Sequence, residues 1–184
     1  MVKPRLGAGL LSLVLMVTAL NTGAALAASA AEINRNANEM LAKLYEKHPD
    51  AKKMAGQATA ILIFPSIYKA GFMFGAQYGE GVLRKANKPV GYYNTVAASY
   101  GWQAGAQAFG YALFFMNESA LSYLDRSGGF EVGVGPSIVV MDEGAGKSTT
   151  SSTLTQDIYA FIFDQKGLMA GAGLQGSKIS KIQK

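Results

Sequence analysis

Glycine is so frequent between residues 71 and 110 that this stretch cannot form long helices. Its glycines are Gly71, Gly75, Gly79, Gly81, Gly91, Gly101, Gly105 and Gly110, and each would cost a helix about 1 kcal/mol. Large aromatic residues stand between them, and the pattern returns at residues 128–135 and 167–173. In strands, missing side chains permit bulges and close backbone approach. The pattern therefore predicts a strongly curved antiparallel β-sheet, either barrel-like or sandwich-like.

Helices are expected before this sheet and at one point within it. Between residues 31 and 47 the apolar residues recur at spacings of three and four, which is the stripe of an amphipathic helix. Its opposite face mixes acidic and basic residues, which favours packing onto the core over insertion into a membrane. A second short helix is expected over residues 50–58, before an apolar strand at 60–64 that Pro65 closes. Asn117 is a suitable N-cap for an inserted helix, so the predicted fold class is α+β.

The first 27 residues have the three parts of a cleaved secretory signal peptide. A basic segment is followed by an apolar segment from residue 10 to 20 and by the small-residue site Ala25-Leu26-Ala27. A retained membrane anchor is the alternative, but the apolar segment falls short of the roughly 20 residues that a span needs. We expect the mature protein to begin near Ala28 and to be exported to a periplasm or out of the cell.

The charge and the cysteine content exclude several classes of site. The sequence has no cysteine, which rules out disulfide bonds and thiolate metal sites. It has 17 basic and 12 acidic residues, and two of the basic ones lie in the signal peptide, so the mature chain has 15 against 12, or +3. No nucleic acid partner is expected, because such partners need a dense basic surface. The small excess is compatible with an anionic membrane surface.

Residues suited to catalysis are few and scattered. His48 is the one histidine and stands beside a proline at a helix boundary, where a solvated or capping role is expected. One histidine without cysteine cannot build a histidine-rich zinc site. The carboxylates are spread out, with Glu80 between two glycines and Asp157 and Asp164 isolated. Although a carboxylate pair could still form in the fold, we expect no enzyme activity, no metal and no cofactor.

An apolar segment around a lysine follows the first predicted strand. Ile67, Tyr68 and Phe72 could belong to the core. Alternatively, they form an exposed loop that inserts into the headgroup layer of a membrane while Lys69 meets a phosphate. The basic segment 84–89 is expected to be a turn between strands, with its three charges exposed.

Several blocks of sequence in a fixed order resemble a known family. They are residues 60–75, 78–83, 99–107 and 115–121, and the segment 159–176 is similar as well. Together they resemble the SYLF domain, also called the Ysc84 actin-binding domain, over nearly the whole mature chain. The resemblance implies binding of membrane phospholipid, with phosphoinositides for eukaryotic members and filamentous actin for fungal ones. With an expected signal peptide and no SH3 or FYVE domain, the chain is similar to the stand-alone exported bacterial type, for which actin is not expected.

The residues and the resemblance together predict one domain over residues 28–184 that binds phospholipid at a membrane surface, with anionic lipids expected. The candidate lipid-binding residues are Lys52, Lys53, Ile67, Tyr68, Lys69, Phe72, Arg84, Lys85 and Lys88. Two alternatives remain open. A carrier would enclose an apolar ligand in a cavity of the curved sheet on the order of several hundred Å³. A protein-interaction module of the cell envelope would use the aromatic surface and show no lipid preference.

Overall fold

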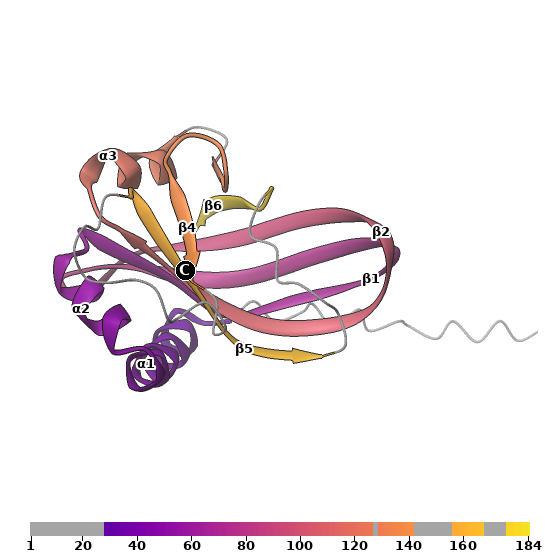
Figure 1. Ribbon diagram of the computed structural model, residues 1–184, viewed down its shortest axis with the longest axis horizontal. Helices are drawn as coiled ribbons and strands as arrows, with labels where there is room; N and C mark the ends of the chain where they lie inside the picture. The colour runs from indigo at the N-terminus through magenta and orange to yellow at the C-terminus, as the bar shows by residue number, and fades with distance from the viewer. Residues whose placement is uncertain (1–27, 127–128, 142–155, 168–175) are drawn as a thin grey trace, which may run out of the picture.

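The computed structural model describes residues 28–126, 129–141, 156–167 and 176–184, and the side chains of residues 72–73 and 99–104 are not described. The predicted signal peptide lies outside these ranges. Within them, helices cover one end of a curled half-barrel sheet (Figure 1). In chain order the elements are α1 (Ala30–Lys47), α2 (Pro49–Gln57), β1 (Ala60–Lys85), β2 (Lys88–Phe115), α3 (Glu118–Leu121), a 3-10 turn (Ser122–Asp125), β3 (Phe130–Glu131), β4 (Ile138–Met141), β5 (Ile158–Gly167) and β6 (Lys178–Ile182).

A long hairpin of β1 and β2 forms the frame of the sheet. Its turn is Ala86-Asn87, with φ values of 45° and 64°, the left-handed pair that two-residue hairpins favour. Both strands fold back at mid-length, at the end of the molecule opposite the helices (Figure 1). The fold-back needs glycine, because a Cβ at Gly71 would lie 2.3 Å from the carbonyl oxygen of Phe74. The expected role of the dense glycines in a strongly curved sheet is thus confirmed.

The remaining strands pair with the two halves of β2. The first half pairs with β6, from Tyr92 opposite Ile182 to Val96 opposite Lys178. The second half pairs with β5, and β3 extends the sheet beyond β6. All these pairs are antiparallel, whereas β4 runs parallel to β5. Parallel neighbours need a long connection, and residues 142–157 provide it between β4 and β5.

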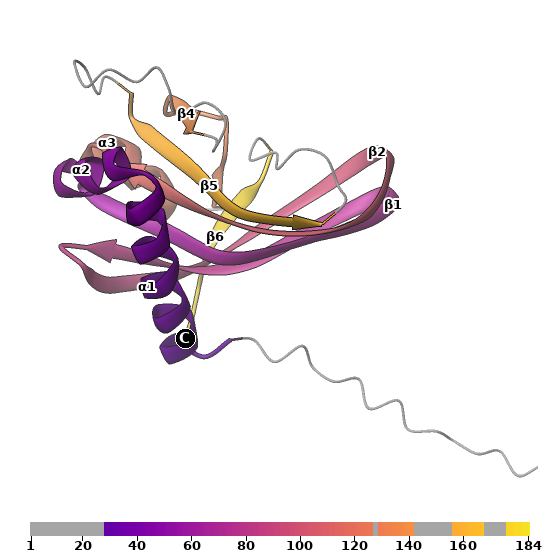
Figure 2. The same ribbon diagram turned by 60° about the horizontal axis from the view of Figure 1, so that its bottom comes forward.

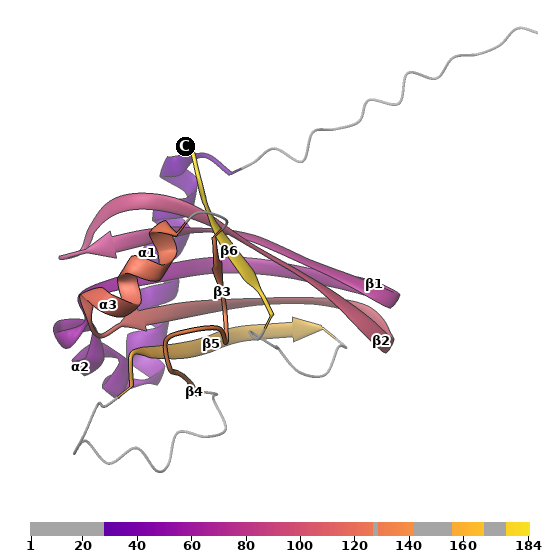
Figure 3. The ribbon, with the colours of Figure 1, turned by 90° about the horizontal axis from the view of Figure 1, so that it is seen from above.

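The sheet has a core on each of its two faces. On the outer face, α1 buries Ile33, Ala37, Leu41 and Leu44 against Ile63, Val82, Ala112, Phe114, Tyr159, Phe161 and Phe163. On the inner face, α3 and the 3-10 turn close over Phe64, Ile67, Tyr111, Leu113 and Phe115. Figures 2 and 3 show α1 and α3 on opposite sides of the sheet. The expected packing of the amphipathic helix onto the core is confirmed.

The helix ends agree closely with the sequence analysis, and one strand end does not. Ser29 caps α1 by accepting a hydrogen bond from the Glu32 amide at 3.2 Å, and Asn117 caps α3 by accepting one from the Ala120 amide at 2.8 Å. The prediction that Pro65 closes the first strand is wrong. β1 continues through a bulge between Phe64 and Ile67, which accommodates the residue without an amide hydrogen.

Candidate functional site

The predicted lipid-binding residues lie in two separate places. Lys52 and Lys53 are exposed on α2, where Lys53 pairs with Asp50 at 3.2 Å. The β1–β2 turn, which Lys88 follows in an exposed position, lies at the same end of the molecule as α2 (Figure 1). Tyr68 lies in β1 on the way to the fold-back at the opposite end. The structure therefore does not combine these basic and apolar residues into one surface.

Arg84 corrects the prediction that all charges of segment 84–89 are exposed. Its side chain is buried, with 6% of the residue accessible. The guanidinium donates to the Asn38 Oδ1 and, at 3.1 Å, to the Asn34 carbonyl oxygen, both on α1. Burial lowers the pKa of Arg84. Arg84 still belongs to β1, and its side chain points to the face of the sheet that α1 covers. It therefore stabilises the contact between β1 and α1 and is not available to bind a ligand.

Lys85 and Lys88 flank the turn in different surroundings. Lys85 is half-buried and bonds to the Glu118 carboxylate at 3.4 and 3.5 Å. Lys88 is exposed. Their predicted exposure thus holds for Lys88 and in part for Lys85.

The loop predicted around Lys69 is a strand, which changes what its residues can do together. Successive side chains of a strand point to opposite faces. Ile67 is fully buried in the inner core, while Tyr68 is 66% exposed on the outer face. Lys69 is half-buried opposite Gln107, on the other face from Tyr68. Insertion by Ile67 is therefore wrong, as is joint action of Tyr68 and Lys69. The side chain of Phe72 lies outside the described residues.

An apolar surface covers the outer face of the hairpin beyond α1. Its large members are Tyr68, Phe74, Tyr78 and Val96, which are 66%, 70%, 47% and 46% exposed. The residues between them are alanines, whose short side chains keep the surface shallow and uncharged: Ala70, Ala76, Ala98, Ala106 and Ala108. Cross-strand pairs join the two strands, for example Tyr78 with Val96 and Ala76 with Ala98. We call these nine residues the outer apolar face.

Most residues of this face were not predicted from the sequence. Its signal was the alternation of Phe74, Ala76 and Tyr78 with glycine and glutamine in β1, a period of two that is typical of a half-buried strand. A register shift between Phe72 and Phe74 separates Tyr68 from this run, so the alternation alone could not connect Tyr68 to Phe74 and Tyr78.

A groove borders the outer apolar face on the side of α1. It has a volume of about 400 Å³, and its walls include Tyr68 and Tyr78 from β1 and Ile33 and Asn36 from α1. Glu80 and Ala28 line the same groove.

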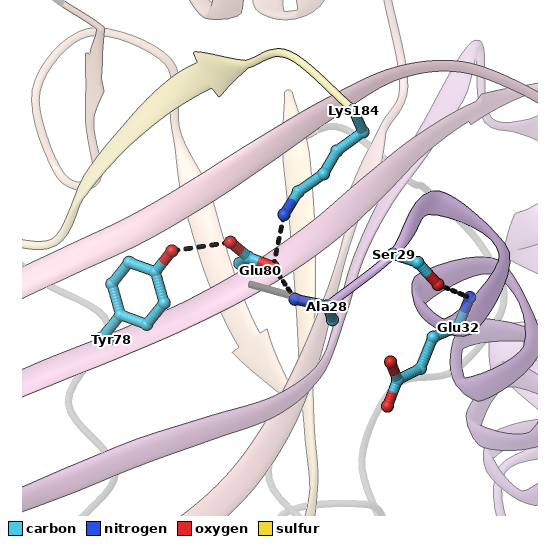
Figure 4. Close-up of polar contacts among 6 residues, drawn as sticks. All are labelled: Ala28, Ser29, Glu32, Tyr78, Glu80 and Lys184. Carbon is cyan, nitrogen blue, oxygen red and sulfur yellow. Dashed lines mark hydrogen bonds and ion pairs between the residues drawn. The ribbon is translucent and has the colours of Figure 1, made fainter. Parts of the chain in front are cut away.

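A buried carboxylate joins the two ends of the described chain at this groove (Figure 4). Glu80 accepts hydrogen bonds from the Tyr78 hydroxyl at 2.7 Å, the Lys184 Nζ at 2.8 Å and the Ala28 amide at 3.1 Å. The Glu80 and Lys184 side chains are each only 9% exposed. Burial raises the pKa of Glu80, but the bonds from Lys184 and Tyr78, the Lys184 charge and the Ala28 amide together hold it below its ordinary value.

Tyr78 belongs both to this cluster and to the outer apolar face. Burial, together with the hydrogen bond to Glu80 and the Glu80 charge, raises the pKa of Tyr78 to about 12. Its hydroxyl is therefore a neutral donor at physiological pH, and the ring remains available on the outer apolar face.

Two kinds of feature are absent from the residues that the structure describes. Among those residues, no helix is long and apolar enough to cross a membrane. The same ranges contain no group of three or more His, Asp or Glu side chains placed to hold a metal ion.

Comparison with known proteins adds one finding. Residues 96–184 match a family model described as Ysc84, Las17-binding protein actin regulator. The matched part runs from within β2 to Lys184, two residues beyond β6, and includes α3. No curated protein matches the sequence significantly. The resemblance found in the sequence is thus confirmed for residues 96–184.

Proposed function

We propose that this chain, which has a Ysc84/SYLF domain over residues 96–184, is an exported protein that binds phospholipid membranes with its outer apolar face. One observation carries the proposal, namely the run of exposed aromatic and small apolar side chains along both strands of the hairpin. Contiguous apolar surface of this kind marks interaction sites on folded proteins. We assign it no catalytic role.

The chemistry of the face favours a lipid interface over a single small ligand. Tyrosine is suited to the boundary between headgroups and acyl chains, because its ring is apolar and its hydroxyl is polar. The alanines add no charge that insertion would have to dehydrate. A shallow, extended surface of large and small apolar groups can therefore enter the headgroup layer without rearrangement of the fold.

Electrostatic attraction has a secondary role in this proposal. The mature chain has a net charge of +3 by the count above, which favours anionic membranes over neutral ones. Exposed Lys52, Lys53 and Lys88 lie at the end of the molecule opposite the fold-back, so we expect them to add long-range attraction without direct headgroup contact.

The two alternatives receive different support. A carrier needs an internal cavity, but the described inner face is filled by fully buried side chains such as Phe64, Tyr111 and Phe115. A protein-interaction module could bind its partner through the same outer apolar face. Actin, which the family description mentions, could be such a partner. Binding experiments separate these partners from lipid.

The test uses vesicle co-sedimentation with the variant Tyr68→Ser/Phe74→Ser. Burying a large side chain contributes about 1.5–3 kcal/mol when complete, so losing two partly inserted rings should weaken binding about tenfold or more. The control Val90→Ser/Val140→Ser changes two side chains outside the face, which are 52% and 45% exposed, and should bind as wild type.

Three results would contradict the proposal. They are wild-type protein that does not sediment with any vesicle, a Tyr68→Ser/Phe74→Ser variant that binds as wild type, and a control variant that loses binding equally. Filamentous actin in a parallel sedimentation should leave the protein in solution. Sedimentation with actin but without vesicles would support the actin alternative instead.

A further inference from the structure

The main-chain nitrogen of Ala28 is bound to a buried carboxylate. It donates to the Glu80 Oε2 at 3.1 Å, and the Lys184 Nζ donates to the same oxygen at 2.8 Å (Figure 4). Figures 2 and 3 both show the start of α1 beside the C-terminal end of the chain. Three segments far apart in the sequence therefore converge on one carboxylate.

Ala28 is also the residue at which the sequence predicts the mature protein to begin. Hydrolysis of the Ala27–Ala28 peptide bond adds one water. Ala27 keeps a carboxylate, and the nitrogen of Ala28 becomes a primary amine that takes up a proton. The group that now donates to Glu80 would thus change from a neutral amide into an ammonium.

We propose that Glu80 is a receptor for the N-terminal ammonium of the processed chain. Cleavage after Ala27 converts the neutral hydrogen bond into a partly buried ion pair beside Lys184. The inference rests on the export that forms part of the proposed function, and not on the membrane contact. It assigns a role to a carboxylate that neither the sequence nor the membrane proposal required.

The surroundings of the cluster decide whether an ammonium is favoured there. The positive charge of Lys184 and the N-terminal end of α1, which prefers anions, disfavour an ammonium at this place. The direct contact with Glu80 favours an ammonium, and so does the carboxylate of Glu32. Glu32 lies in the first turn of α1 and lines the same groove. Tyr78 donates to Glu80 as a neutral hydroxyl. With the ammonium bound, Glu80 would contact two cations, and the Glu32 carboxylate in the wall of the same groove would supply a second negative charge.

Processing would therefore stabilise one particular part of the fold. A charge-assisted hydrogen bond is roughly twice as strong as a neutral one, and this one joins the start of α1 to β1. The same place is the wall of the groove beside Tyr78 and the outer apolar face. Only the processed chain would join the start of α1 to this wall by an ion pair.

The experiment uses protein that has been exported and purified without a tag at its N-terminus. Intact mass establishes the first residue. The pKa of the N-terminal amine is then measured by pH-dependent reductive methylation with mass spectrometric readout. An ordinary N-terminal amine has a pKa of about 7.7–8.0. We expect a pKa raised by about one unit or more in the wild type, because a carboxylate in contact favours the charged form.

The matched variants are Glu80→Gln, which removes the receptor charge, and Glu46→Gln, which changes an exposed carboxylate near the other end of α1. The first should return the pKa of the amine to its ordinary range, and the second should leave it raised. If Glu80→Gln fails to fold, wild-type protein acetylated at the N-terminus replaces it. Unmodified protein should then melt higher than acetylated protein near pH 7. The difference should disappear as the pH rises through the raised pKa of the amine.

Two results overturn the inference and are distinguishable. A mature protein that starts elsewhere than Ala28, or that retains Met1, overturns both the cleavage site and the receptor. A protein that starts at Ala28 with an ordinary amine pKa, unchanged by Glu80→Gln, overturns the receptor alone. Vesicle binding by the wild type is measured separately, so neither result decides the membrane proposal.

Discussion

Replacement of Gly81 by alanine tests whether the fold depends on close contact between the two halves of β1. In the second half of β1, a Cβ at Gly81 would lie 2.4 Å from the Ile63 carbonyl oxygen and 2.7 Å from the Phe64 ring. Ile63 and Phe64 belong to the first half of the same strand and are fully buried. The two halves therefore touch at a point where only hydrogen fits.

The magnitude follows from how far the backbone would have to move. Ordinary contact begins near 3.4 Å, so the two halves must separate by about 1 Å, and the carbonyl oxygen cannot rotate away as a side chain could. Overpacking of this kind costs about 1–3 kcal/mol. For a domain of this size, each 1 kcal/mol lowers the melting temperature by about 2–4 °C.

Gly56→Ala is the matched control, because it makes the same chemical change in open space. Apart from the adjacent residues and the backbone of the helix itself, no atom lies within 4 Å of a Cβ at this position in α2, and alanine is the better helix former by about 1 kcal/mol. Thermal unfolding should therefore show Gly81→Ala melting several degrees below wild type and Gly56→Ala at or slightly above it. A Gly81→Ala protein as stable as wild type would refute the close approach of the two halves of β1.

Three further predictions follow from single side chains. Arg84→Ala should lower the free energy of unfolding by about 2–3 kcal/mol, because it leaves two oxygens of α1 without their charged donor, whereas Lys88→Ala should change it by less than about 0.5 kcal/mol in urea unfolding. Tyr68→Ala should cost less than about 1 kcal/mol in the same assay, since the side chain is largely exposed; a loss of about 3 kcal/mol would place it in the core. The pKa of Glu80 lies below its ordinary value of 4.5, so its stabilising effect is present above that pH and is lost as the pH falls through the lowered pKa; the melting temperatures of wild type and Glu80→Gln should converge in acid, and a gap that persists at pH 2–3 would contradict this assignment.

Local sequence was sufficient for the general architecture because its signals are short in range. Glycine spacing predicted the curved sheet, and the predicted cap Asn117 lies immediately before the helix that it begins. The predicted strand end at Pro65 was wrong, because a bulge lets a strand pass through a residue that lacks an amide hydrogen.

The site depended on contacts between distant residues, which a single sequence does not reveal. Arg84 stands in a basic segment that has the pattern of an exposed turn, but its partners Asn34 and Asn38 lie on α1, 50 and 46 residues away. Glu80 and Lys184 are separated by 104 residues. Ile67 and Tyr68 were predicted to act together, either in the core or in an exposed loop, whereas the strand places Ile67 in the core and leaves Tyr68 exposed.

The most direct test of the membrane contact places a reporter on the outer apolar face. The sequence has no cysteine, so Tyr68→Cys and Val90→Cys each give a single site for an environment-sensitive fluorophore. Both positions are exposed, at 66% and 52%, but only the first belongs to the face. On addition of phospholipid vesicles, the emission of the label at 68 should shift to shorter wavelength while that of the label at 90 stays unchanged. Vesicle-bound protein in which the label at 90 shifts and the label at 68 does not would contradict the account.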